Sequence, residues 1–324
     1  MTELSFCSGL GADIQKFIEQ KQAAGHPYDQ SSKLLWHLDR MISDKFPECT
    51  KLSKEICDAW IEKNSKLHQN TLLRRVTPVR QLGKYLSGIG YNAYIIPSGI
   101  PSKQVQYDAH IFTEKELVAF FCAVDNCPQS PFAPYRCFVI PVIFRLLFTC
   151  GLRSSEARLL KTSDIELETG KIFIRATKGW EARIVYASND LLNLVGRYNA
   201  IIGKAFPNRE AFFTNQNGTY YSRSTLDVWF HEFWDPLPEA ADTKGNPPRV
   251  HDFRHSYCVY RINQWVHEKK NLNALYPYLS EFLGHSNFYD TDYYLKLSAP
   301  FYPEFHERMH MTNANILPEV PHEE

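Results

Sequence analysis

The sequence predicts a mainly α-helical fold with one small antiparallel β-sheet, arranged as two domains. The 324 residues suit two domains, because one domain usually holds about 100–200 residues. Apolar residues recur at helical spacing through most of the chain. Residues 162–188 differ, because short β-branched runs alternate there with turn residues.

Residues 1–95 are predicted to form a small all-helical domain. Its apolar residues recur every three or four positions in four stretches, Ile14–Ile18, Leu34–Ile42, Ile56–Ile61 and Leu72–Leu86. Pro78 lies inside the last stretch and is expected to kink or restart that helix. Gly88 is expected to end it. Residues 96–107 contain prolines, serines and a glycine, a composition typical of a linker.

Residues 108–300 are predicted to form the larger domain, mostly helical with the sheet inside it. Its first helix begins with a T-x-x-E capping box made by Thr113 and Glu116. An apolar helix over 137–149 follows. Three short strands are then expected, at Asp164–Leu167, Lys171–Ala176 and Ala182–Ala187. Helical spacing returns from residue 188, and residues 301–324 form a tail.

The composition excludes several classes of protein. Hydrophobic residues are 44% and charged residues 22% of the chain, which is typical of a globular protein and not of a disordered or fibrous one. The longest apolar run, Cys137–Leu152, is too short to span a membrane. Eight cysteines without a C-x-x-C pair, and no basic leader at the N-terminus, predict a cytoplasmic protein with reduced thiols and no membrane partner.

The charge is balanced overall but uneven along the chain. The 36 basic and 36 acidic residues cancel, yet residues 1–107 carry 14 basic against 10 acidic ones. A nucleic acid responds to local potential and not to total charge. A basic surface for phosphate contact is therefore predicted in the first domain, at Lys63, Lys66, Arg74, Arg75, Arg80 and Lys84.

Four segments of the larger domain carry unusual polar content. One contains an arginine with a glutamate three residues later, and one places a lysine at a turn between strands. The third has a histidine and an arginine at i and i+3 on one helical face, and the last is L-G-H-S with a tyrosine nine residues after its histidine. The candidate functional residues are Arg153, Glu156, Lys178, His251, Arg254, His285 and Tyr294.

Together these side chains could perform phosphoryl transfer. The planar fork of an arginine matches two phosphate oxygens, and two arginines could neutralise a phosphodiester and its transition state. A tyrosine could attack the phosphorus and form a covalent phosphotyrosine. A lysine or histidine could protonate the departing oxygen. Because the arginines supply the positive charge, neither a metal nor a cofactor is expected.

In order, spacing and residue type, the motifs G-L-R-x-x-E, H-x-x-R-H and L-G-H-S resemble the tyrosine recombinase (phage integrase) family. The motif resemblance covers residues 105–298, and residues 10–95 resemble the helical core-binding domain of that family by pattern only. The resemblance implies a SAM-like core-binding domain followed by a catalytic domain. It also implies an enzyme that cleaves and rejoins DNA at specific sites through a 3′-phosphotyrosine.

The resemblance implies a role for each candidate residue. The two arginines would clamp the scissile phosphate, and Glu156 would orient the first of them. Lys178 would be the general acid, and His251 would assist proton transfer or hold the phosphate. His285 would donate a hydrogen bond to a non-bridging oxygen, and Tyr294 would be the nucleophile.

Two neighbouring residues compete with or adjoin these candidates. Tyr293 is adjacent to Tyr294, but the family spacing favours Tyr294. Adjacent helical residues point about 100° apart, so only one of the two can face the phosphate. His255 directly follows Arg254 and is predicted to point off the face that Arg254 shares with His251, as a packing residue.

The resemblance also implies the partners. Double-stranded DNA would be clamped between the two domains, and four protomers would form a synaptic homo-tetramer, with the tail 301–324 docking onto a neighbouring protomer. The short first domain favours the compact, Xer-like or mobile-element type. The sequence around Tyr294 differs from the usual Xer ending and favours a mobile-element recombinase.

Three alternatives remain at the level of the sequence. A type IB topoisomerase would share the phosphotyrosine chemistry and only relax DNA. A DNA-binding regulator would have lost catalysis, although every catalytic position holds the expected residue. A zinc peptidase is suggested by the string His306-Glu-Arg-Met-His310, but no third ligand accompanies it.

Overall fold

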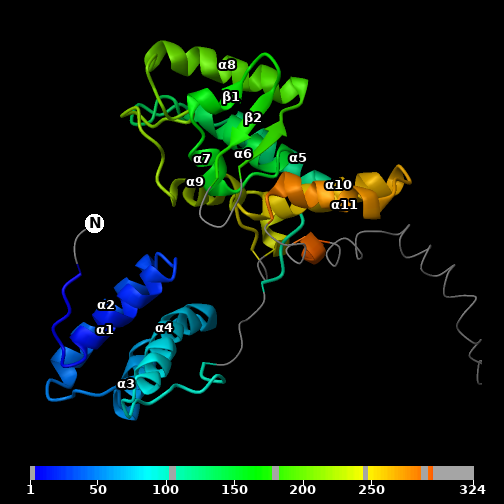
Figure 1. Cartoon of the computed structure of the whole chain (residues 1–324). Helices are drawn as coiled ribbons and strands as arrows, with labels where there is room; N and C mark the ends of the chain where they lie inside the picture. Colours follow the sequence, from blue (N-terminus) through cyan, green and yellow to red (C-terminus); the bar gives the residue numbers. More distant parts are fainter. Residues whose placement is uncertain (1–3, 102–106, 177–181, 244–246, 286–290, 295–324) are drawn as a thin grey trace, which may run out of the picture. The chain divides into compact units, whose positions relative to one another are not determined.

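The computed structural model describes residues 4–101, 107–176, 182–243, 247–285 and 291–294 (Figure 1). Two compact units contain them, one within Met1–Tyr107 and the other within Asp108–Glu324. Both units are mainly helical, and the second contains a three-stranded antiparallel sheet, so the predicted fold class is confirmed. In the described part of the chain, no helix combines the length and the apolar character needed to cross a membrane.

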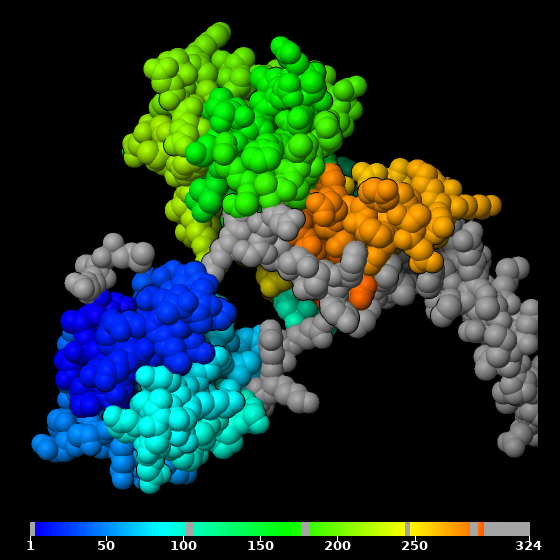
Figure 2. Space-filling view, in the orientation of Figure 1, coloured from blue at the N-terminus to red at the C-terminus, as the bar shows by residue number. Residues whose placement is uncertain are grey.

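The first unit packs its helices into one body, coloured blue to cyan in Figure 2. Its helices are α1 (Gly11–Ala23), α2 (Asp29–Lys45), α3 (Lys54–Lys63) and α4 (Gln69–Gly88). Helix α4 contacts each of the other three, because every helix turns one apolar stripe inward. Trp60 is fully buried in this core, and its indole N–H donates to the carbonyl of Arg75 at 3.2 Å.

Pro78 does not restart the last helix of this unit, contrary to the expectation from sequence. Helix α4 runs continuously through Pro78 and ends at Gly88, as predicted. Proline removes one backbone donor, but Val76, Val79 and Leu82 around it are fully buried. Tertiary packing of this stripe therefore outweighs the local preference.

The beginning of the predicted linker belongs structurally to the first unit. Ile96 is buried in the helical core. Arg80, from α4, donates through Nε to the carbonyl of Ile96 at 2.9 Å and through Nη2 to the carbonyls of Pro97, at 3.0 Å, and Ile100. One guanidinium thus ties the chain that follows α4 to the helix itself.

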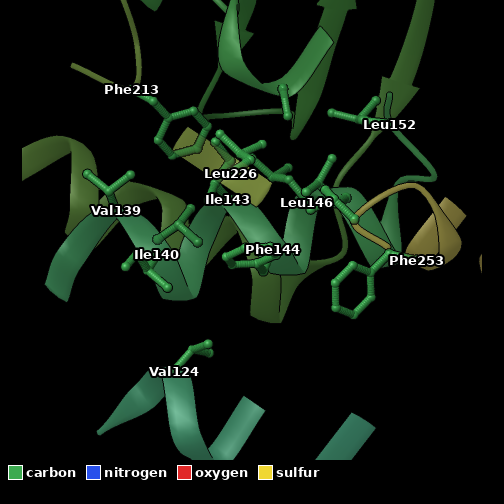
Figure 3. Packing of buried hydrophobic residues seen from close by; sticks show 14 of the residues in the cluster. Val124, Val139, Ile140, Ile143, Phe144, Leu146, Leu152, Phe213, Leu226 and Phe253 are labelled. Carbon is green, nitrogen blue, oxygen red and sulfur yellow. The ribbon is translucent and has the colours of Figure 1, made fainter. Parts of the chain in front are cut away.

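The second unit is built around one apolar helix, α6 (Arg136–Thr149). Its side chains are buried on most sides, as expected for a helix without a polar face. Figure 3 shows Ile143, Phe144 and Leu146 of this helix close to Leu226 and Phe253. The helices packed against it are α5 (Glu114–Asp125), α7 (Ser154–Arg158), α8 (Asn189–Ala205) and α10 (Asp252–His267).

Helix α5 of the second unit begins with the predicted capping box. Thr113 accepts from the backbone N–H of Glu116, and the Glu116 side chain accepts from the Thr113 backbone, so α5 begins as predicted. The further helical elements are η1 (Thr162–Asp164), α9 (Thr225–Trp234), η2 (Pro238–Thr243) and α11 (Leu272–Leu283).

The sheet confirms the three predicted strands, each shorter than expected. Its strands are β1 (Ile165–Glu166), β2 (Lys171–Ile174) and β3 (Arg183–Tyr186), antiparallel in the order β1-β2-β3. Ile172 pairs with Val185, and both are buried. Phe173 and Ile184 pair on the exposed face. Side chains alternate between the two faces of a strand. Arg183 lies two residues before Val185 and therefore shares its inner face.

Candidate active site

Two glycines set the backbone of the site. Gly151, after α6, has a φ of +58°, and a Cβ there would lie 2.7 Å from Cδ1 of Tyr257. Gly284, the C-cap of α11, has a φ of +65°. Residues with side chains rarely adopt this left-handed conformation. The glycines of the G-L-R and L-G-H motifs are therefore needed to turn the chain toward the arginine and the histidine that follow them.

Arg153 is held by Glu156, one helical turn later in α7. The backbone N–H of Arg153 donates to Glu156 Oε2 at 2.9 Å, and its Nη1 donates to Oε1 at 2.7 Å. Nη2 of Arg153 donates to the carbonyl of Gly284 at 3.1 Å. The structure thus brings the first arginine, its glutamate and the end of the L-G-H motif together.

Arg254 joins three of the motifs from α10. Its side chain is 1% exposed. Nη1 donates to the carbonyl of Gly151 at 2.7 Å, and Nη2 donates to the carbonyl of Leu283 at 2.6 Å. Nη2 also lies 3.1 Å from Nε2 of His285. A buried guanidinium is tolerated only when its donors are satisfied, and these partners satisfy them.

The contacts of His285 fix its tautomer. A guanidinium can only donate, so Nε2 of His285 accepts from Arg254 and carries no proton. In the neutral ring the proton then lies on Nδ1, which donates to the hydroxyl of Thr291 at 2.7 Å. Burial and the charge of Arg254 lower the pKa of His285 to about 3. His285 is therefore a hydrogen-bond acceptor toward Arg254.

His251 and His255 lie side by side at the start of α10, with ring centroids 4.8 Å apart. Desolvation by neighbouring groups and the charge of Arg254 lower the pKa of His251 to about 4. His255 is 9% exposed, and its ring centroid lies 5.4 Å from that of Tyr294. His255 therefore packs against the site, as predicted, but the expectation that it points off the face of His251 is wrong, because a spacing of four returns to the same helical face.

The two adjacent tyrosines, Tyr293 and Tyr294, have different surroundings in the structure. Tyr294 is 3% exposed, and its ring stacks on His285 with centroids 5.9 Å apart. Burial raises the pKa of Tyr294, and the positive charge of Arg254 beside it offsets part of this rise. The hydroxyl of Tyr293 instead accepts from the backbone N–H of Ala109 at 3.1 Å. Only the Tyr294 hydroxyl lies beside the guanidinium of Arg254.

Several sequence-based candidates are not among the described residues. Lys178, the tail 301–324 and the string His306–His310 lie outside the described residues. Among the residues that are described, no group of three or more His, Cys, Asp or Glu side chains could hold a metal ion.

The six basic residues proposed for the first unit are not equivalent. Lys63, Lys66, Arg74 and Lys84 are exposed. Arg75 is partly buried and donates to the side chain of Asn64 at 3.0 Å. Arg80 donates to the three backbone carbonyls described above, and so has a role within the unit. The prediction of phosphate contact therefore depends mainly on the exposed four.

Protonation of Glu156 is expected to destabilise the second unit. Burial alone raises the pKa of this carboxyl, but hydrogen bonds from Arg183 and Arg153 outweigh burial and lower it to about 2. A carboxyl whose pKa falls from 4.5 to about 2 on folding contributes about 3 kcal/mol. This stability is present above pH 4.5 and is lost as the pH falls toward 2.

Urea unfolding at a series of pH values measures this effect. Glu156→Gln should lower the free energy of unfolding at pH 7, because Arg183 then lacks its buried carboxylate. It should also flatten the loss of stability between pH 5 and pH 3. Glu168→Gln, at an exposed glutamate, is the matched control and should keep the parent slope. An unchanged acid slope in Glu156→Gln would argue against this role.

Comparison with known proteins places the chain in a family. The model of the phage integrase family matches residues 110–299. A Sinorhizobium fredii protein described as an integrase/recombinase, y4rE, is 27% identical over 299 residues, covering 90% of this chain and 93% of that protein. The tyrosine recombinase XerA of Thermococcus kodakarensis is 27% identical over 158 residues, covering 49% of this chain and 51% of that protein.

Solved structures share the fold. The XerH site-specific recombinase bound to difH has a TM-score of 0.61 at 18% identity, covering 89% of this chain and 82% of that one. The Tn1549 transposon integrase has a TM-score of 0.58 at 16% identity, covering 87% and 94%. Fold and family model together define a tyrosine-type site-specific recombinase. The chain belongs to the phage integrase family.

Proposed function

We propose that this protein cleaves and rejoins double-stranded DNA at a specific site through a 3′-phosphotyrosine on Tyr294, without a metal or cofactor. One observation carries the proposal. Arg153, Arg254, His285 and Tyr294 come from separate segments of the chain, yet Arg254 contacts His285, whose ring stacks on that of Tyr294. Arg153 and Arg254 donate to adjacent carbonyls, those of Gly284 and Leu283.

The proposed reaction is a reversible transesterification. The hydroxyl oxygen of Tyr294 attacks the phosphorus, a phosphotyrosine bond forms, and the bond from phosphorus to the 5′ oxygen breaks. The 5′ oxygen leaves with a proton, for which Lys178 is the proposed donor. Religation reverses these steps with a different 5′ hydroxyl, so bond energy is conserved and no nucleotide is consumed.

The arginines must exchange partners when DNA binds. Their N–H groups donate to the backbone carbonyls of Gly284, Gly151 and Leu283, and a phosphate would replace some of these acceptors. Arginine donors redirected to the phosphate would stabilise the charge that develops in the transition state. The proton of Tyr294 needs an acceptor, because burial raises its pKa. His255, whose ring centroid lies 5.4 Å from that of Tyr294, and His251 beside it are the proposed acceptors.

Integration or excision of a mobile element is the biological role we favour, with four protomers in the synaptic complex. The Tn1549 integrase is named as a transposon protein and shares the fold, and y4rE is described as an integrase/recombinase. Chromosome-dimer resolution is the competing role, because the XerA and XerH proteins also resemble the chain. Recombination between two copies of the recovered site, placed in direct or inverted orientation, would distinguish these roles.

Sequencing of trapped DNA tests the proposed activity. The protein is incubated with DNA from its host locus in EDTA, quenched with detergent, and the covalently attached DNA is sequenced. Adducts at one short inverted-repeat site are expected. Adducts at many unrelated sites would favour a type IB topoisomerase activity. Binding without any adduct would favour an inactive regulator.

The exposed lysines and arginine of the first unit are expected to contribute phosphate contacts. Each contact removed should lower the slope of log affinity against log salt by about one. Lys63→Ala, Lys66→Ala and Arg74→Ala are the test variants, with Lys16→Ala in α1 as an exposed control. The affinity is measured by fluorescence anisotropy from 50 to 300 mM salt. Slopes equal to that of the control in all three variants would contradict this interface.

A further inference from the structure

Arg183 is a buried arginine that the proposed chemistry does not use. It begins β3 and faces inward with Val185, and its side chain is 4% exposed. Its Nη1 and Nη2 donate to the two oxygens of Glu156, each at 2.8 Å. Its Nε donates to the carbonyl of Phe282 at 2.6 Å. Every nitrogen of this guanidinium is therefore already engaged inside the protein.

Three arginines hold three consecutive carbonyls at the end of α11. Arg183 donates to Phe282, Arg254 to Leu283, and Arg153 to Gly284. The last carbonyls of a helix lack intrahelical partners and form its negative end. The guanidinium groups therefore satisfy this helix end and fix the residue that follows it, His285.

Glu156 connects Arg183 with Arg153. Its Oε1 accepts from Nη1 of both arginines, at 2.7 Å from Arg153 and 2.8 Å from Arg183. Its Oε2 accepts from the backbone N–H of Arg153 and from Nη2 of Arg183. A Cβ on Gly284 would lie 3.0 Å from Nη1 and 3.2 Å from Cδ of Arg183. Arg183 is thus packed directly against both the carboxylate and the turn before His285.

We infer that Arg183 is a positioning residue for DNA cleavage. Its fork fixes the carboxylate that orients Arg153, and its Nε fixes the helix end that carries His285. It does not touch the phosphate, because its donors point to Glu156 and Phe282. This inference rests on the proposed function, since it assigns Arg183 an effect on the phosphate only through Arg153 and His285.

The test compares Arg183→Met and Arg183→Lys with the control Arg175→Met. Arg175 is a half-exposed arginine beyond the end of β2 whose partner is Asp164. Arg183→Lys keeps a positive charge opposite Glu156, so it serves if Arg183→Met does not fold. Circular dichroism and DNA affinity establish that each variant is folded. Single-turnover cleavage is then measured on the recovered site with either a phosphate or a neutral methylphosphonate at the scissile position.

On the phosphate, both Arg183 variants should cleave on the order of 100-fold more slowly than the parent, the usual effect of misplacing a catalytic group by about 1 Å. On the methylphosphonate, the difference should shrink to within about threefold, because this substrate lacks the charge that Arg153 neutralises. Parent rates on the phosphate would overturn the inference. Equal slowing on both substrates would also overturn it, as it indicates a purely structural role. Failure of the parent to cleave either substrate would instead refute the proposed function.

Discussion

Tyr294→Phe is expected to abolish the covalent protein–DNA adduct, while Tyr293→Phe leaves it intact. The hydroxyl of Tyr294 lies near the positive charge of Arg254, where an attacking oxygen and a clamped phosphate would meet. The hydroxyl of Tyr293 is bound to the backbone of Ala109. Removing a nucleophile leaves no alternative route to a covalent intermediate. The adduct is measured as labelled DNA that migrates with the protein on a denaturing gel.

DNA affinity separates chemistry from folding in this comparison. Tyr293→Phe loses one hydrogen bond, worth about 1 kcal/mol, so this variant should stay folded and bind DNA. Tyr294→Phe should bind equally well, because its hydroxyl is buried in the DNA-free protein. An adduct that persists in Tyr294→Phe and disappears in Tyr293→Phe would reverse the assignment.

The second large effect is expected from Arg254→Lys. Lysine keeps the charge but cannot reproduce a planar fork, so the contacts to Gly151, Leu283 and His285 cannot all be kept. Loss of one donor to a developing oxyanion lowers the rate by about 100- to 1000-fold. Cleavage of the recovered site should fall by at least this factor in single-turnover experiments.

Arg261→Lys is the matched control, because Arg261 lies on the same helix, and its described contacts are with Gln264 and the ring of Tyr257 rather than with the residues of the site. It should cleave at the parent rate. The DNA affinity of Arg254→Lys should stay within a few-fold of the parent. A cleavage rate within threefold of the parent in Arg254→Lys would show that this guanidinium does not act on the phosphate.

The residues of the site could be predicted where short-range spacing places them. A glutamate three residues after a helix N-cap can reach back to the capping residue, and Glu156 accepts from the backbone and side chain of Arg153 in this way. Glycine before an arginine or a histidine predicts a turn, and both Gly151 and Gly284 have positive φ values. Meeting of the four motifs in space was predictable only through the family resemblance, because spacing carries no information on distant contacts.

Other features depend on tertiary contacts that the sequence does not show. Arg183 pairs with Glu156 across 27 positions, and the only local signal is its alternation with Val185 in a strand. His255 could have been placed in the site by its spacing of four from His251. Helix α4 stays continuous through Pro78 because Val76 and Val79 on either side of it are buried in the core of the first unit. That core is formed by all four helices, so the sequence around Pro78 does not reveal it.

Mass spectrometry of the peptide that stays attached to DNA identifies the residue that forms the covalent bond. Nuclease treatment of the trapped adduct followed by trypsin should yield the peptide Asn271–Lys296 carrying a nucleotide. Fragmentation is expected to place a 3′-phosphoryl nucleotide on Tyr294, with a free 5′ hydroxyl on the released DNA strand. A nucleotide on Tyr293 or on any other residue, or a 5′-phosphoryl linkage, would contradict the account.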